Sequence, residues 1–230
     1  MGQDGEKMVR RYYLIVFCIL FFLAGCGEED KREKETTVFT EEQRIIVAAG
    51  DSLTFGYGVS EEEKYPYLLE EKLRESGYNY RVINAGVSAE TSSGLLSRLE
   101  WILTLQPEIV ILETGANDGL RGIDPGLIEE NLQKIITSLL ERDIVVLLAG
   151  MKMVWNLGPF YVKQFDNIYP KLAEEYKLIF FPFFLQGVAM QSSLNLPDGI
   201  HPNGQGYEKI VDNIFPYVLD AIVENENNER

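Results

Sequence analysis

The chain is poor in histidine and cysteine, the two residues that most often bind transition metals and act as bases or nucleophiles. Its 230 residues include one histidine, His201, and two cysteines, Cys18 and Cys26. Both cysteines lie within the first 26 residues, so the remainder can form no disulfide, thiolate metal site or cysteine nucleophile. A zinc site built from His and Cys is therefore excluded, and we expect neither a metal nor an organic cofactor. Any imidazole that acts as a general base must be His201.

Positive charge is also scarce. The chain has 21 Lys and Arg residues against 36 Asp and Glu residues, which gives a formal net charge of -15 at pH 7. Such an acidic surface repels phosphate backbones, so nucleic acid is not an expected partner. It also provides no basic patch for anionic lipid headgroups, so any association with a membrane must have another cause.

The N-terminal segment has the pattern of an export signal. Arg10 and Arg11 precede an apolar run over 12–23, which is too short to span a bilayer comfortably and is typical of a signal peptide. The run ends in Leu23-Ala24-Gly25-Cys26, which resembles the bacterial lipobox, where the cysteine is acylated. We therefore expect a lipid anchor on Cys26 and a place in the bacterial cell envelope. A cleaved signal with an incidental cysteine, or a short membrane anchor, are the alternatives.

The composition changes again after the cysteine, and it divides the chain into four parts. Residues 28–35 form a mixed-charge run that is typical of a disordered tether. We predict a lipoprotein signal over 1–25, a polar tether over 26–43, one globular domain over 44–224 and a disordered tail over 225–230. Translation starts at Met1 or at Met8, since residues 1–7 add nothing that a signal needs.

Within the domain, short apolar runs alternate with segments of helical spacing. Strands are predicted at 44–49, 80–85, 109–112, 144–148 and 178–181, and helices at 67–75, 92–105, 125–142, 160–176 and 206–223. Pro170 is expected to kink or split its helix, and Pro216 to bend the last one. The alternation predicts an α/β fold, a three-layer α/β/α sandwich with a five-stranded parallel sheet. Such sheets bind ligands at the carboxyl ends of their strands.

Polar segments follow the predicted strands. Gly50-Asp51-Ser52-Leu53 follows the first strand, residues 84–91 the second, and Gly115-Ala116-Asn117-Asp118-Gly119 the third, while Asp198 and His201 follow the fifth. Alone, each is an ordinary feature: a capping serine, a turn, a solvated histidine. Their joint occurrence after successive strands favours a catalytic site.

These residue types are those of a serine hydrolase. The Ser52 hydroxyl is a weak nucleophile until a base takes its proton, and His201 is the one available imidazole. Asp198 lies three residues earlier and can fix the tautomer of that imidazole. Attack on a carbonyl creates an oxyanion, which backbone N–H groups and the Asn117 amide can stabilise. The chain order Ser, Asp, His is not diagnostic of one fold.

Taken together, the motifs resemble the four sequence blocks of the SGNH hydrolase superfamily, also called the GDSL esterases and lipases. The blocks lie at 50–53, 84–91, 115–118 and 198–203. Residues 117–122, Asn156-x-Gly158 and residues 181–184 are similar to the subgroup of bacterial thioesterase I, lysophospholipase and arylesterase proteins. The resemblance covers residues 44 to about 222 and implies the flavodoxin-like SGNH hydrolase fold.

The resemblance implies a role for each matched residue. Ser52 matches the nucleophile, His201 the base and Asp198 the acid that orients it. The Ser52 N–H and the Asn117 side chain match two donors of the oxyanion hole. The third donor is a glycine N–H in the family, and its position falls on Ala89 here.

Two family glycines are replaced by alanine, at Ala89 and Ala116. Alanine keeps its N–H, so the oxyanion hole survives if the backbone needs no positive φ there. The added methyl groups would narrow the acyl pocket, so the change affects substrate range more than catalysis. Residues 150–161 match a substrate-side loop of the subgroup, and packing between sheet and helix explains its apolar residues equally well. Its candidates for lining an acyl groove are Trp155, Leu157 and Phe160.

We therefore expect a lipid-anchored serine hydrolase that cleaves carboxylic esters through an acyl-enzyme on Ser52. Export favours lysophospholipids and short acyl or aryl esters over acyl-CoA thioesters, which are cytosolic. An O-acetyl deacetylase acting on glycans and a non-catalytic lipid-binding lipoprotein are the two alternatives. No protein partner is evident from the sequence.

Overall fold

The computed structural model describes residues 43–153 and 157–228, which belong to the compact unit Thr40–Arg230. Three of the predictions fall outside the described residues, namely the lipoprotein signal with Cys26, most of the tether, and Trp155. None of the helices within the described residues is long and apolar enough to cross a membrane.

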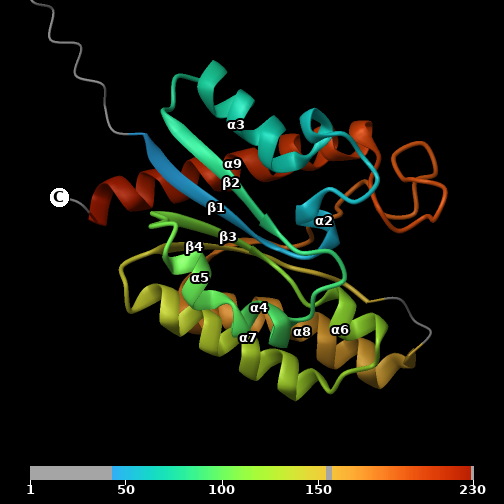
Figure 1. The fold of residues 1–230 in the computed structure, drawn as a ribbon. Coiled ribbons are helices and arrows are strands. Elements are labelled where there is room, and N and C mark those ends of the chain that lie inside the picture. Colours follow the sequence, from blue (N-terminus) through green and yellow to red (C-terminus); the bar gives the residue numbers. More distant parts are fainter. Residues whose placement is uncertain (1–42, 154–156, 229–230) are drawn as a thin grey trace, which may run out of the picture. The chain divides into compact units, whose positions relative to one another are not determined.

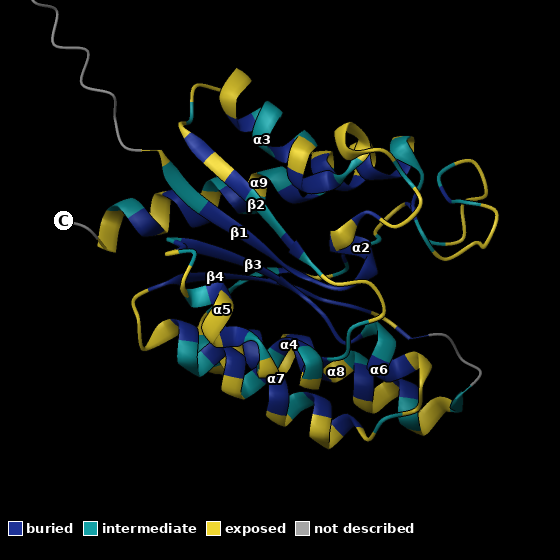
Figure 2. Cartoon of the chain, in the orientation of Figure 1, coloured by how far each residue is buried: buried dark blue, intermediate teal, exposed yellow. Residues whose placement is uncertain are grey.

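The centre of the domain is one sheet of five parallel strands, in the order β2-β1-β3-β4-β5 (Figure 1). The strand bounds are β1 Arg44–Gly50, β2 Tyr80–Gly86, β3 Ile109–Glu113, β4 Val145–Ala149 and β5 Ile179–Phe181. Every residue of β3 and β4 is buried (Figure 2), as expected of a parallel sheet covered on both faces. The predicted five-stranded parallel sheet is confirmed.

Helices cover both faces of the sheet, which gives the predicted three layers (Figure 1). Helices α3 and α9 pack together on one face, and α4, α5, α7 and α8 lie on the other. The bounds of these helices are α3 Tyr65–Glu75, α4 Ser92–Ser97, α5 Leu99–Leu103, α7 Pro125–Leu140, α8 Pro159–Tyr176 and α9 Gly204–Asn228. Three short elements, which the sequence patterns did not predict, are α2 Ser52–Phe55, η1 Glu61–Glu63 and α6 Ala116–Leu120.

The predicted single helix over 92–105 is divided at Arg98. The Ser97 hydroxyl donates to the Gly94 carbonyl at 2.6 Å, the oxygen that the Arg98 N–H would bond in a continuous α-helix. Arg98 instead donates to the Leu95 carbonyl at 3.2 Å, and its backbone leaves the helical region. A local side-chain hydrogen bond therefore ends α4 and starts α5.

The two internal prolines do not interrupt their helices. Helix α8 is continuous through Pro170 and α9 through Pro216. Both helices bury a long apolar face against the sheet, and this packing outweighs the one backbone hydrogen bond that each proline removes. Helix α9 also continues to Asn228, and Asn225 is buried, so the segment predicted as a disordered tail from 225 is helical up to 228.

The carboxyl ends of three neighbouring strands lie level with one another. Gly50 of β1 pairs with Gly86 of β2 on one side and with Glu113 of β3 on the other. Strand β2 pairs with one edge of β1, and β3 pairs with the other edge. The direction in which strands are added therefore reverses between β1 and β3, which is the switch point of the sheet. The segments that follow these strands therefore meet at one edge.

Candidate active site

The three residues predicted as nucleophile, base and orienting acid lie together at this edge. The Nε2 atom of His201 is 3.0 Å from Ser52 Oγ, and its Nδ1 atom is 2.8 Å from Asp198 Oδ2. Ser52 and His201 are 149 positions apart in the sequence, so only the fold brings them into contact. This connectivity allows His201 to take a proton from Ser52 while Asp198 holds the imidazole.

The loop that carries Asp198 and His201 is fixed by its own hydrogen bonds. Asp198 Oδ1 accepts the backbone N–H groups of Ile200 and His201 at 2.9 and 3.0 Å. Burial raises the pKa of Asp198, but the hydrogen bonds from the His201 backbone and ring and from Ile200 outweigh this and lower it to about 2. Asp198 is therefore ionised at neutral pH. Its charge favours the tautomer in which Nδ1 carries the proton and Nε2 can accept one.

Ser52 is the first residue of α2, and Asp51 alone separates it from the end of β1. Asp51 caps α2, because its side chain accepts the Leu53 N–H at 3.0 Å. This short connection leaves no space for a side chain on Gly50, where a Cβ atom would lie 2.2 Å from Thr54 Oγ1 and 2.4 Å from the Glu113 carbonyl oxygen. This close approach explains why glycine precedes the Asp51-Ser52 pair.

The Asn117 amide is held in a defined orientation beside Ser52. Its Nδ2 atom donates to Asp51 Oδ2 at 3.0 Å, and a carboxylate can only accept, so the nitrogen faces Asp51. The second Nδ2 hydrogen remains for a ligand. Burial raises the pKa of Asp51 to about 6, even though the hydrogen bonds from Leu53 and Asn117 lower it. At neutral pH the Asp51 carboxylate is therefore charged and fixes the amide.

Two backbone N–H groups complete the set of predicted oxyanion donors. Among the described residues, neither the Ser52 N–H nor the Ala89 N–H donates a hydrogen bond to a protein acceptor. Unpaired N–H groups are rare in folded proteins unless they face solvent or a ligand. Both groups are therefore free of protein acceptors, as a donor to an oxyanion must be.

Ala89 has a backbone conformation that alanine rarely adopts. The turn Val87-Ser88-Ala89-Glu90 is closed by the Glu90 N–H, which donates to the Val87 carbonyl at 3.1 Å. Ala89 has a φ of 64° at the third position, as in a type II turn, where glycine is preferred. From the sequence, we expected alanine to replace the family glycine freely only if this position needs no positive φ. The position does have a positive φ, and Ala89 adopts it. Alanine occupies it at a cost of about 1 kcal/mol.

An apolar cavity of about 590 Å³ opens beside Ser52 and His201. Its largest apolar side chains come from the coil after β4 and from the segments after β5, including Met151, Met153 and Phe183. Ala116 also lines the cavity, so its methyl group narrows this space as the sequence predicts, whereas Ala89 is not among the lining residues.

Two of the predicted groove residues lie elsewhere. Leu157 packs against the hydrophobic core, and Phe160 is 76% exposed at the start of α8; neither lines the cavity. Met151 and Met153, from the same loop, line the cavity. The signal for them was present, since both lie in the predicted substrate-side loop at alternate positions directly after β4.

A buried acid behind the nucleophile was also missed. Glu113 ends β3 with no exposed surface, and its Oε2 atom accepts the Thr54 hydroxyl at 2.9 Å. Burial, and then the nearby charge of Asp51, raise the pKa of Glu113 well above its ordinary value, so the side chain keeps its proton. An acidic residue at the end of the apolar run 109–112 was the available signal.

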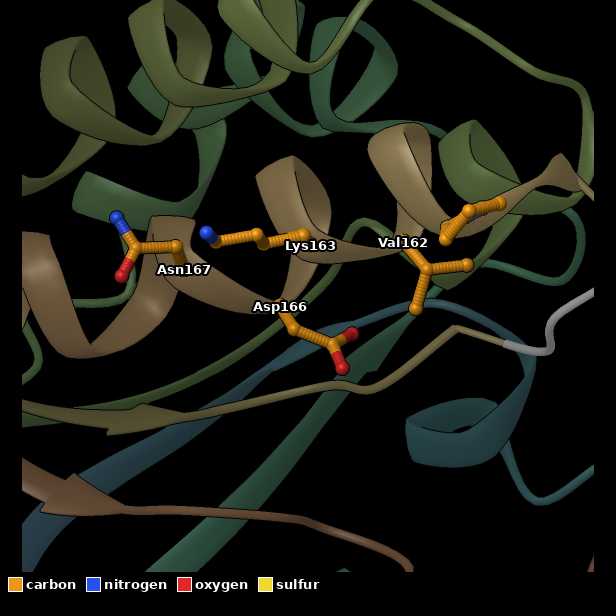
Figure 3. A pocket seen from close by; sticks show the side chains of 5 residues that line it. Val162, Lys163, Asp166 and Asn167 are labelled. Atoms are coloured by element: carbon orange, nitrogen blue, oxygen red, sulfur yellow. The ribbon is translucent and has the colours of Figure 1, made fainter.

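A second hollow of about 480 Å³ lies along α8, where Val162, Lys163 and Asp166 are among its lining residues (Figure 3). Figure 3 shows the Asp166 carboxylate directed toward the coil that follows β4. There its Oδ1 atom accepts the Met153 N–H at 3.0 Å. Asp166 thus holds one wall of the cavity beside Ser52. No cluster of His, Cys, Asp and Glu within the described residues is arranged to hold a metal ion.

Comparison with known proteins agrees with this site. Residues 48–209 match the GDSL-like Lipase/Acylhydrolase family. The chain is 35% identical to the esterase TesA of Pseudomonas aeruginosa over 174 residues, which cover 75% of this chain and 87% of that protein. It is 36% identical to the Escherichia coli protein named thioesterase 1/protease 1/lysophospholipase L1 over 168 residues, 73% of this chain and 79% of that protein.

Solved structures show the same fold. The crystal structure of AlinE4, an SGNH-hydrolase family esterase, is 44% identical and superposes with a TM-score of 0.66, covering 78% of this chain and 97% of that one. The matched residues 48–209 include the segments that carry Ser52, Asn117 and His201. The chain therefore belongs to the GDSL-like Lipase/Acylhydrolase family.

Proposed function

We propose that this enzyme hydrolyses carboxylic esters through an acyl-enzyme on Ser52. The observation that carries the proposal is the continuous chain Asp198–His201–Ser52, with contacts of 2.8 and 3.0 Å, beside an apolar cavity. Relatives named esterase and lysophospholipase support the same reaction class.

The geometry supports the following sequence of steps. The Ser52 Oγ proton passes to His201 Nε2 as the oxygen attacks the ester carbonyl carbon. The carbonyl oxygen becomes an oxyanion, which the Ser52 N–H, the Ala89 N–H and the free hydrogen of Asn117 Nδ2 stabilise. Protonated His201 then gives its proton to the leaving alcohol. Water, activated by the same imidazole, hydrolyses the acyl-enzyme and restores Ser52.

The cavity favours acyl chains longer than acetyl. Its lining is mainly apolar, and each methylene that it buries is worth about 0.8 kcal/mol, or about a fourfold gain in kcat/KM when fully expressed in the transition state. Lysophospholipids and medium-chain acyl or aryl esters fit this chemistry. The methyl group of Ala116 reduces the space next to Asn117 and limits bulk near the reacting carbonyl.

The test compares p-nitrophenyl esters of increasing acyl length with a lysophospholipid and an acyl thioester, using Ser52→Ala as the blank. We expect Ser52-dependent turnover that rises with acyl length until the cavity is filled. Turnover confined to acetate esters and acetylated glycans would instead favour the O-acetyl deacetylase. Failure of Ser52 to react with a fluorophosphonate would favour a non-catalytic lipid-binding protein.

We also propose that the enzyme is exported and anchored by a lipid on Cys26. The support is sequence alone: two arginines, an apolar run and the segment Leu23-Ala24-Gly25-Cys26. Such a location would place the enzyme among envelope lipids and away from cytosolic acyl-CoA. Cys26→Ala should move the protein from the membrane to the soluble fraction and leave ester turnover unchanged. If this variant stays in the membrane fraction, lipidation of Cys26 is not the anchor.

A further inference from the structure

Two of the three predicted oxyanion donors, Asn117 and Ala89, come from segments that one short helix connects. Asn117 lies in α6, and Ala89 lies in the turn after β2. Arg121, at the end of α6 and four residues after Asn117, donates from Nη2 to the Ala89 carbonyl at 2.8 Å. The helix that carries one donor therefore also holds the residue that carries another.

The same helix also holds the start of α4, two residues after this turn. Asp118 is fully buried, and its two carboxylate oxygens accept the Ser92 N–H at 2.8 Å and the Ser92 hydroxyl at 2.7 Å. Segment 89–92 is thus attached to α6 at both ends, by Arg121 at Ala89 and by Asp118 at Ser92. These contacts connect the two segments that carry the donors.

The turn needs such attachment because its third residue is not glycine. Ala89 is strained at its φ of 64°, because alanine prefers a negative φ. A rotation of φ toward negative values turns the Ala89 carbonyl relative to the Ala89 N–H, so a hydrogen bond that holds the carbonyl opposes this rotation. Glycine adopts both signs of φ readily, so an alanine here relies more on contacts from its surroundings.

We propose that Arg121 is a positioning residue of the oxyanion hole: by holding the Ala89 carbonyl, it keeps the Ala89 N–H directed at the reacting carbonyl oxygen. This inference rests on the proposed function, in which that N–H is a donor. Arg121 is not among the residues that line the cavity, so it acts through Ala89 and not on the substrate. Within the described residues, the bond to Ala89 is the one hydrogen bond of its side chain, so its removal breaks no other.

The test uses the full chain in detergent, with p-nitrophenyl butyrate as substrate and thermal unfolding as the measure of folding. We expect Arg121→Ala to lower kcat about tenfold with KM changed less than twofold, because a misplaced donor costs less than the roughly 10²–10³-fold of a removed one. Arg121→Lys, which keeps a charged donor, should recover part of the loss. If Arg121→Ala does not fold, Arg121→Met keeps the apolar stem and removes the donor.

Arg142→Ala is the matched control. Arg142 is another exposed arginine that donates to a backbone carbonyl, that of Ser138, at 2.9 Å. It lies just before β4, at the amino-terminal edge of the sheet, so its removal makes the same charge change away from the site. We expect this variant to keep the wild-type kcat.

A second pair of variants separates positioning from general stabilisation. With Ala89→Gly the turn no longer depends on outside contacts, so adding Arg121→Ala should lower kcat less than threefold. An equal loss in both backgrounds, or an effect on KM alone, would overturn the proposal.

The outcome also separates this inference from the proposed function. Absence of Ser52-dependent turnover in the wild type would refute both. Normal wild-type turnover together with an unchanged kcat in folded Arg121→Ala would refute the role of Arg121 and leave ester hydrolysis standing.

Discussion

Replacing Glu113 with glutamine should change how the stability of the domain depends on pH. Glu113 is fully buried beside the Asp51 carboxylate, and its Oε1 atom has no hydrogen-bond partner within the described residues. Its pKa in the folded protein is raised well above the ordinary 4.5, so folding takes up a proton at any pH between these two values. Stability from this residue is fully present below pH 4.5 and is lost as the pH rises toward the folded pKa.

The magnitude follows from linkage. One proton taken up on folding changes the free energy of unfolding by about 1.4 kcal/mol per pH unit. Glutamine is always neutral, so Glu113→Gln removes this slope, and the stability of the variant relative to the wild type should improve by about 1.4 kcal/mol between pH 5 and 6. The new amide leaves a buried donor unpaired, at a cost of about 1–3 kcal/mol that does not vary with pH. The informative quantity is therefore how the difference in unfolding free energy between the variant and the wild type changes with pH, and not the stability at one pH.

Urea unfolding of the two proteins at half-unit steps from pH 5 to 8 measures this slope. Asp51, whose pKa is about 6, titrates in the same range and interacts with Glu113, so the difference in slope between the two proteins reports the Asp51–Glu113 pair and not Glu113 alone. Glu62→Gln, at an exposed glutamate of η1, controls for loss of one surface charge. Parallel pH profiles for Glu113→Gln and the wild type would show that Glu113 does not carry a proton in the folded state.

Three further predictions concern catalysis. Asn117→Ala should lower kcat by about 10²–10³-fold with little change in KM, because one oxyanion donor is lost; a large rise in KM alone would refute that role. Asp198→Asn should lower kcat by about 10⁴-fold in steady-state assays, because the imidazole loses the partner that fixes its tautomer; near-normal turnover would refute the hydrogen-bonded chain. Met151→Trp should fill the cavity and shift the acyl-length optimum to shorter p-nitrophenyl esters; an unchanged optimum would place the acyl chain elsewhere.

The positions of Ser52, Asn117, Asp198 and His201 were predictable because two simple patterns coincide. Ser52 and Asn117 lie in polar segments that closely follow β1 and β3, and parallel strands bring their carboxyl ends to one edge. His201 is the one histidine of the chain, and Asp198 lies three residues before it. The fold class follows from the same alternation. Neither step requires knowledge of side-chain contacts between distant segments.

What sequence patterns missed depends on such contacts. The positive φ of Ala89 and its contact with Arg121 involve residues 32 positions apart, and the residue types alone do not indicate them. Trp155, Leu157 and Phe160 were candidates for the cavity wall, with packing between sheet and helix as the alternative, whereas Met151 and Met153 line the cavity. Side-chain direction in the coil after β4 depends on outside partners such as Asp166, which accepts the Met153 N–H.

The local expectation of a split helix at Pro170 failed for a similar reason. Pro170 was expected to kink or split its helix and Pro216 to bend the last one, and α8 and α9 are continuous through both prolines. Intrinsic propensity is a local quantity, whereas the apolar face that each helix buries extends over several turns and determines the outcome.

Helix α6 also limits the routes by which substrate preference can evolve in this enzyme. Helix α6 and the residue after it carry the cavity-lining Ala116, the proposed oxyanion donor Asn117, and Asp118 and Arg121, which bond to Ser92 and Ala89. A substitution that reshapes the cavity from this side moves catalytic parts at the same time. The coil after β4 carries Met151 and Met153 and none of those parts, so selection or engineering for new acyl chains can proceed there at little risk to turnover.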